Sequence, residues 1–311
     1  MKLTKRNNYN LKASVHTAEV KSNDVFLVDA QKDYIKTVIS KDGRQSTSVI
    51  NPNKYGSDIF SFERFREVFE LILKESQIED YRFTRADMRL DNYDPTHYRA
   101  FAKLNKYLIS ALMVTYKVKN SYKTLDLLTE DQISIAVKND YFEVENYDRG
   151  HKNIVTGNTK EIAQARLEER SKAKTWRKLN GEQLIYADSD WNMQMLKHEF
   201  TVGWSERWDK ARKNLKLVQD TYNDELVKKY YEGLNARPVQ FRTLTDFLIQ
   251  KQDCIFTSMQ MVDLLKRLGV TNAENRAKYH KKRYGIEYFS QKDVDFAIRE
   301  IKRATAQFFD C

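Results

Sequence analysis

The stretch Arg85-Ala86-Asp87-Met88-Arg89-Leu90-Asp91 alternates strictly between charged and apolar side chains. Successive side chains of a β-strand point to opposite faces of a sheet, so a period of two is typical of a half-buried strand. We expect a strand over 81–91, with the apolar side chains toward a core. The arginines and aspartates would then share the other, open face.

Two later segments repeat this alternation. In the first, 142–147, Phe142 and Val144 would be buried, and Asn139-Asp140 just before it is a turn signal that predicts a hairpin. The second is a strand over 162–171. Together with 81–91 these strands predict one polar sheet face, which would be lined by Arg85, Asp87, Glu143, Glu145, Tyr147, Arg166 and Glu168.

Helical patterns separate and follow these strands. Apolar residues recur at helical spacing after Ser61, which is a candidate cap. They recur again after Asp94, which would cap a helix that begins at Pro95. From about residue 190 the pattern is helical to the end. The order predicts an α+β fold: an antiparallel sheet with helices on one face, followed by a helical C-terminal region. We expect a flexible N-terminus over 1–22, a sheet domain over 23–190 and a helical domain over 191–311.

The composition favours a polyanion as partner and disfavours several classes of protein. The chain has 311 residues and a net charge of +10. Basic proteins commonly meet nucleic acid, although this charge could serve solubility alone. Two cysteines without a CxxC pair fit a cytoplasmic protein. No apolar run is long enough to span a bilayer, so we expect no membrane partner. The sequence has no Gly-rich phosphate loop and no HExxH.

The expected polar face carries ligands for a hard cation. Asp87 and Glu168, with Glu145 as a third ligand, could hold Mg²⁺ or Mn²⁺ through oxygen atoms. Arg85 and Arg166 could clamp phosphate with two parallel hydrogen bonds. The alternative is that these side chains form cross-strand ion pairs on a solvated sheet face, which would contribute little.

Tyr147 is the candidate nucleophile. It ends its strand on the polar face, and Arg149 and Lys152 follow at once. Nearby cations stabilise a phenolate and hold a phosphate in place. A tyrosine beside a carboxylate-bound metal could cut a DNA phosphodiester and keep one end covalently attached.

A pair of helices near the C-terminus, 258–268 and 272–283, is joined by a short glycine-containing turn. The second helix is basic, so the pair is similar to a helix-turn-helix that reads duplex DNA. The alternative is that the pair only packs within a helical tail. Its candidate DNA contacts are Arg276, Lys278, Lys281 and Arg283.

Four strings in this order resemble the rolling-circle replication initiators of small Gram-positive plasmids and the related relaxases of mobile elements. They are Ile50-Asn51-Pro52-Asn53-Lys54, Arg85-Ala86-Asp87, Tyr147-Asp148-Arg149 and Arg166-Leu167-Glu168. The likeness covers roughly 45–172. It departs from the family at Glu169 and Arg170, where a more apolar strand is usual, and it does not extend beyond 172.

The resemblance implies a relative of the HUH endonucleases that lacks the His-x-His motif, with 23–190 as the nickase domain. Tyr147 would attack one strand of an origin and become linked to the 5′ phosphate, with the metal bound by Asp87 and Glu168. The implied partners are duplex and single-stranded origin DNA, a host helicase, a host polymerase and a second copy of the chain. Alternatives are a conjugative relaxase with the same chemistry, a non-catalytic DNA-binding regulator, and an adaptor protein of a mobile element.

Overall fold

The computed structural model describes residues 10–23, 32–55, 59–118, 134–149, 163–182, 185–238, 240–286 and 288–310. Within these ranges seven strands form one antiparallel sheet in the order β2-β3-β1-β4-β7-β6-β5. The strands are β1 (Leu11–Ser22), β2 (Ile35–Ile39), β3 (Ser46–Ile50), β4 (Tyr81–Asn92), β5 (Ile135–Lys138), β6 (Phe142–Asp148) and β7 (Ala165–Lys172).

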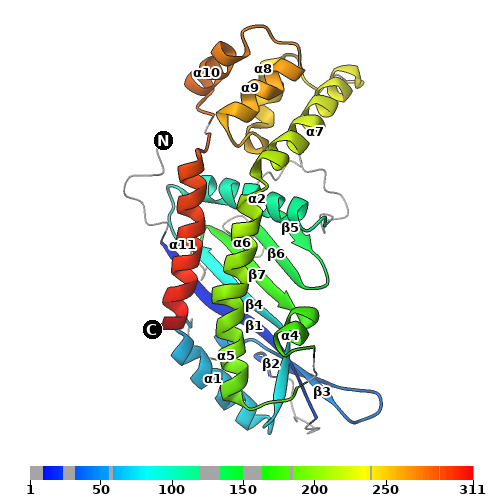
Figure 1. Cartoon of the computed structure of the whole chain (residues 1–311), viewed down its shortest axis with the longest axis vertical. Helices are drawn as coiled ribbons and strands as arrows, with labels where there is room; N and C mark the ends of the chain where they lie inside the picture. The colour runs from blue at the N-terminus through cyan, green and yellow to red at the C-terminus, as the bar shows by residue number, and fades with distance from the viewer. Residues whose placement is uncertain are drawn as a thin grey trace.

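Helices cover one face of this sheet, and α7 to α10 extend beyond its end (Figure 1). The helices are η1 (Pro52–Lys54), α1 (Phe62–Glu75), α2 (Tyr98–Thr115), α4 (Ala173–Leu179), α5 (Ser189–His198), the π-helical turn η2 (Glu199–Gly203), α6 (Trp204–Arg212), α7 (Leu215–Asn235), α8 (Leu244–Gln250), η3 (Gln252–Cys254), α9 (Ser258–Arg267), α10 (Ala273–Tyr284) and α11 (Gln291–Asp310). Across the described ranges, none of them is both long and apolar enough to cross a membrane. The coarse prediction of an α+β fold with an antiparallel sheet is confirmed.

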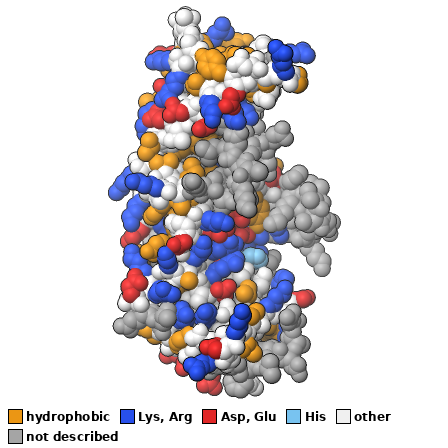
Figure 2. Space-filling model, turned by 90° about the vertical axis from the view of Figure 1, so that its right-hand side faces the viewer, with side chains coloured by type: hydrophobic (Ala, Val, Ile, Leu, Met, Phe, Trp, Pro, Cys, Tyr) orange, Lys and Arg blue, Asp and Glu red, His pale blue; other side chains and the backbone are white. Residues whose placement is uncertain are grey.

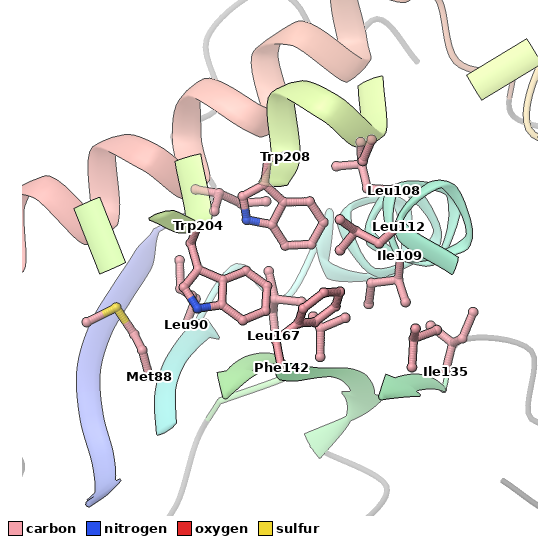
Figure 3. Close-up of a cluster of buried hydrophobic side chains, with 14 of the residues drawn as sticks. Met88, Leu90, Leu108, Ile109, Leu112, Ile135, Phe142, Leu167, Trp204 and Trp208 are labelled. Atoms are coloured by element: carbon pink, nitrogen blue, oxygen red, sulfur yellow. The ribbon is translucent and has the colours of Figure 1, made fainter. Parts of the chain in front are cut away.

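The main core lies between the sheet and its helices. The apolar side chains of the alternating strands point to this side, where they meet two tryptophans of α6 (Figure 3). Residues that share this core include Met88, Leu90, Leu108, Ile109, Leu112, Ile135, Phe142, Leu167, Trp204 and Trp208. Because one face of each strand is used for this core, most charged residues of β4, β6 and β7 are placed together on the other face.

Local signals position the strands and the first helices. Ser61 caps α1 by accepting a hydrogen bond from the Arg64 N–H, as expected. Asn139 closes the β5–β6 hairpin, since its side chain accepts hydrogen bonds from the backbone N–H groups of residues 141 and 142. The helix after Asp94-Pro95 begins later than predicted, at Tyr98, because Asp94 accepts the N–H groups of 96 and 97 in a turn before the helix.

The prediction of a flexible segment over 1–22 is wrong for its second half. Residues 11–22 form β1, which lies in the middle of the sheet between β3 and β4. Its buried apolar residues are Leu11, Ala13 and Val15, then Ala18 and Val20. A register shift between Val15 and Thr17 changes which positions face the core. This irregularity breaks the period of two, so the alternation signal is lost in the sequence.

The predicted boundary at 190 does not separate two cores. Trp204 and Trp208 on α6 belong to the same hydrophobic cluster as the strands of the sheet, and α11 packs against β1. The C-terminal residues therefore supply helices that complete the sheet layer. Only α7 to α10 lie beyond it in Figure 1.

One acidic residue lies on the helix-covered side of the sheet. Glu169 is 1% exposed, and its Oε1 accepts a hydrogen bond of 2.6 Å from Trp208 Nε1. Burial raises the pKa of Glu169 to about 8, and Glu199 adds to the rise, whereas the Trp208 bond and Arg207 oppose it. The folded protein therefore holds a proton at neutral pH that the unfolded chain releases.

We expect Glu169→Gln to remove a pH dependence of stability. The wild type binds this proton more tightly when folded, so its free energy of unfolding should fall as the pH rises from the ordinary value of 4.5 to about 8. Over this range the wild type should lose on the order of 3 to 4 kcal/mol of its free energy of unfolding relative to Glu169→Gln. Urea unfolding of both proteins at about pH 5 and about pH 8 measures it. If the free energies of unfolding of the wild type and of Glu169→Gln changed by the same amount between these pH values, Glu169 would not be the group that holds the proton.

Candidate active site

The register of three neighbouring strands arranges the polar face in rows. Tyr147 on β6 lies opposite Arg166 on β7, which lies opposite Asp91 on β4. We call these three residues the tyrosine row. In the next row Glu145, Glu168 and Arg89 lie opposite one another, and the third row holds Glu143, Arg170 and Asp87. The predicted polar face therefore exists, and residues distant in sequence meet on it.

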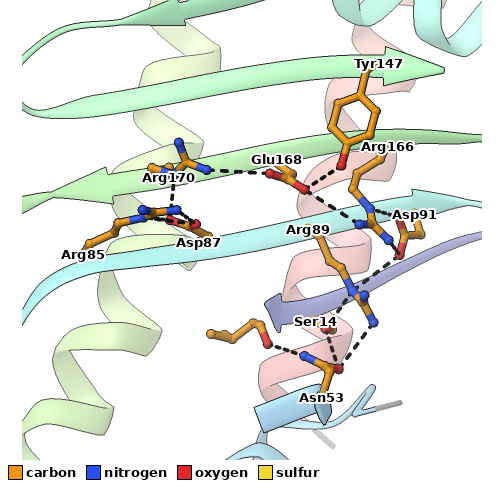
Figure 4. A network of polar contacts seen from close by, with 11 residues as sticks. Ser14, Asn53, Arg85, Asp87, Arg89, Asp91, Tyr147, Arg166, Glu168 and Arg170 are labelled. Atoms are coloured by element: carbon orange, nitrogen blue, oxygen red, sulfur yellow. Dashed lines mark hydrogen bonds and ion pairs between the residues drawn. The ribbon is translucent and has the colours of Figure 1, made fainter. Parts of the chain in front are cut away.

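The tyrosine row is buried and closely bonded (Figure 4). The Tyr147 hydroxyl donates a hydrogen bond of 2.8 Å to Glu168 Oε1. Arg166 Nε and Nη2 donate to the two carboxylate oxygens of Asp91, at 2.5 and 2.9 Å. Tyr147 is 8% exposed, and Arg166 and Asp91 are 2% and 1% exposed. A tyrosine and a carboxylate that can accept its proton thus lie beside a guanidinium held by two bonds.

Arg89 connects this site to the Ile50–Lys54 segment. Its Nε lies 3.4 Å from Asp91 Oδ2 and donates to Ser14 Oγ at 3.1 Å, and its Nη2 donates to Asn53 Oδ1 at 3.3 Å. Asn53 is anchored to β1 because its Nδ2 donates to the Val15 carbonyl at 3.0 Å. Residues of all four strings that carry the resemblance therefore lie on one sheet face, and Asn53 is joined to the tyrosine row through Arg89 (Figure 4).

The predicted pair Arg85 and Asp87 lies farther from the tyrosine. Asp87 is in the third row, where Arg85 and Arg170 both bond to it. Arg85 lies opposite Lys172, six residues from Asp91 along β4, which corresponds to roughly 20 Å of strand. The second Arg-x-Asp repeat, Arg89 and Asp91, is the one beside Tyr147. The sequence contains both repeats, and local alternation does not distinguish them.

The environment of Tyr147 keeps its hydroxyl protonated. Burial raises the pKa of the phenol, the charge of Glu168 raises it further, and Arg166 opposes both effects. The hydroxyl therefore needs a base before it can attack. Glu168 Oε1 is placed to be that base, since it already accepts the hydroxyl hydrogen bond at 2.8 Å.

The predicted metal ligands are not gathered into one site. Both oxygens of Asp87 accept hydrogen bonds from arginines, and its side chain is 2% exposed. Glu145 and Glu168 face each other across β6 and β7. Among the described residues, no group of three acidic, histidine or cysteine side chains is close enough to hold a metal ion. Asp87, Glu168 and Glu145 as arranged here do not fit a shared cation.

The predicted DNA contacts are dispersed. Arg149 directly follows β6, and its backbone N–H donates to the Gln164 carbonyl, whereas Lys152 lies outside the described residues. Figure 2 shows Lys and Arg side chains along the whole length of the face turned toward the viewer, in keeping with the net charge of +10.

The predicted helix pair forms as α9 and α10. Its turn contains Gly269 at a φ of +73° and Asn272 at +54°, conformations that glycine and asparagine adopt at low cost. Lys278 and Lys281 line a hollow of about 670 Å³ together with Lys216 and Lys266. Arg276 and Arg283 are not among its lining residues, so the four predicted contacts of α10 do not form one patch.

Compared with known proteins, the chain matches no family model, no curated protein and no solved structure.

Proposed function

We propose that the polar face is the active site of a DNA nicking and closing enzyme, and that the protein initiates replication of a plasmid or mobile element. One observation carries the proposal: the Tyr147 hydroxyl is hydrogen-bonded to Glu168 beside Arg166. The convergence of Asn53, the second Arg-x-Asp repeat and these residues on one face supports it, because an initiator would need these groups together.

The proposed reaction is transfer of a phosphodiester to tyrosine. Glu168 takes the phenolic proton while the Tyr147 oxygen attacks phosphorus. The bond from phosphorus to the 3′ oxygen breaks, and the 5′ phosphate remains on the tyrosine. The 3′ oxygen takes a proton from water, and the proton held by Glu168 passes to the hydroxide that is left. The reverse reaction closes the strand. Arg166 and Arg89 supply positive charge next to the transferring phosphate.

Access to this site requires movement, because Tyr147 is 8% exposed and Arg166 is 2% exposed. The more open third row offers a first contact for DNA, since the side chains of Arg170 and Glu143 are each 20% exposed and that of Arg85 is 34% exposed. Arg85, which bonds to Asp87 in the free protein, would hold a phosphate along the strand from the nick.

A search for a covalent adduct tests the proposal. The full chain is incubated with single-stranded oligonucleotides that tile the DNA flanking its own coding sequence, with Mg²⁺, Mn²⁺ or a chelator. A denaturing gel then separates free protein from protein carrying DNA. An adduct in any of these conditions supports the reaction. If it disappears with the chelator, the reaction needs a cation, which would require an arrangement of ligands other than the one described above for Asp87, Glu168 and Glu145. No adduct with any oligonucleotide and either metal would contradict the proposal.

Conjugative transfer would use the same chemistry, and the element that the nicked origin belongs to would distinguish it from replication. A DNA-binding regulator is the second candidate. The four lysines around the hollow between α9 and α10 favour it, since they outnumber the two carboxylates there, Asp263 and Glu274. This candidate predicts salt-sensitive binding of duplex DNA without cleavage.

We expect Lys278→Ala with Lys281→Ala to weaken binding of duplex DNA. If both lysines contact phosphates, their loss should lower the slope of log affinity against log salt by about 1.8. Cleavage of a single-stranded oligonucleotide should stay near that of the wild type, because Tyr147 lies on the sheet. Lys36→Ala with Lys41→Ala is the matched control, since these two lysines are exposed and do not line the hollow. A salt slope of Lys278→Ala with Lys281→Ala equal to that of the wild type would mean that the hollow has no role in duplex binding.

A further inference from the structure

A second hollow lies at the other end of β6 from Tyr147. It has a volume of about 540 Å³ and is bounded by the β5–β6 turn, α4, the π-helical turn η2 and α6. This volume falls within the range of sites for small molecules. Its side chains include Tyr116, Tyr141, Lys178, His198, Arg207 and Lys210, and none of these belongs to the tyrosine row.

The π-helical turn η2 forms one wall of this hollow. Glu199, which is 1% exposed, accepts hydrogen bonds from Ser171 Oγ at 2.5 Å and from Arg207 Nη1 at 2.6 Å. A Cβ atom at Gly203 would lie 2.5 Å from Glu199 Oε2, so the turn needs a glycine for this carboxylate to fit. Single π-helical turns inside α-helices are frequent at functional sites.

Arg207 is held rigidly at the hollow. Its guanidinium lies 5.5 Å from the Phe142 ring and 4.8 Å from the Trp204 ring, and Glu199 fixes one end. Within the described chain its remaining N–H groups have no acceptor. An arginine that is stacked and oriented in advance loses little freedom when it binds an anion.

The other lining groups add an aromatic surface and positive charge from Lys178, whereas the Lys210 ammonium lies 4.0 Å from the carboxylate of Glu206, which also lines the hollow. Tyr141 is 46% exposed, and Tyr116 packs edge-on against Phe142 at 5.1 Å. Lys178 is exposed and has no carboxylate partner among the described residues. Exposed rings offer a face on which a planar base can stack, and the cations suit a phosphate.

We propose that this hollow binds a nucleotide, with the base against Tyr141 and the phosphate between Arg207 and Lys178. The nucleotide is either a free mononucleotide or one unit of a single strand. This site is independent of the proposed tyrosine chemistry, because it uses neither Tyr147 nor the residues that bond to it.

Equilibrium binding in a Tyr147→Phe background tests the site without cleavage. The probes are dAMP, dTMP and an oligonucleotide of ten thymidylates. We expect Tyr141→Ala and Lys178→Glu each to weaken binding at least tenfold, because one removes the stacking ring and the other reverses a charge. Gly203→Ala should have a similar effect by displacing Glu199. Arg177→Glu is the matched control, because it makes the same charge change one residue away and does not line the hollow.

The probes identify the source of the nucleotide. Loss of mononucleotide binding in the variants supports a free nucleotide, and loss of oligonucleotide binding alone supports a single strand. Tyr141 and Lys178 are exposed, so their substitutions should leave the fold intact. They still test the site if Gly203→Ala disturbs folding. Absence of binding by every probe overturns the proposal, as does an equal affinity of the wild type, Tyr141→Ala and Lys178→Glu.

Discussion

Tyr147→Phe is expected to abolish the covalent protein–DNA adduct and to lower strand cleavage by more than about 10³-fold. The substitution removes only the hydroxyl that donates to Glu168 Oε1 at 2.8 Å. The ring stays in place, so folding and DNA binding should be retained. The measurement is adduct formation on a denaturing gel, together with the affinity for the same oligonucleotide.

Tyr141→Phe is the control for this experiment. Tyr141 precedes the same strand, and the period of two puts it on the same face as Tyr147, so it is the next candidate nucleophile. The bond to Glu168 is made by Tyr147, so removal of the Tyr141 hydroxyl should leave the adduct intact. An adduct that survives Tyr147→Phe and disappears with Tyr141→Phe would mean that Tyr141, at the other end of β6, is the nucleophile.

Asp91→Ala is expected to have the largest effect on stability, a loss of roughly 3–5 kcal/mol in the free energy of unfolding. Asp91 is 1% exposed and accepts both bonds of the Arg166 fork. Removing the carboxylate leaves a buried guanidinium without these bonds, and a buried charge that loses its partner is costly. Urea unfolding measures the loss.

Asp190→Ala provides the matched comparison. Asp190 also pairs with an arginine, Arg66, but its side chain is 69% exposed. Water and salt screen such a pair, so this substitution should cost no more than about 1 kcal/mol. If Asp91→Ala costs as little as Asp190→Ala, the tyrosine row does not stabilise the sheet, and its burial must be explained otherwise.

Several local elements, and most of the side chains on each sheet face, follow from patterns in the sequence alone. The period of two in 81–91 and 142–147 predicted two strands of the observed sheet, because a strand that buries one face needs alternation. Ser61 and Asn139 predicted a helix start and a turn, because each side chain satisfies backbone groups within a few residues. These signals depend only on neighbours along the chain.

Tertiary structure alone decided which charged residues meet. The two Arg-x-Asp repeats of β4 are equivalent in sequence, and only the pairing with β7 and β6 places Asp91 beside Arg166 and Tyr147. The register shift in β1 breaks the alternation of its sequence, so the strand that brings Ser14 to Arg89 was not predicted. Such contacts join segments separated by tens of residues, so they follow from strand pairing and core packing across the whole sheet, which no local period encodes.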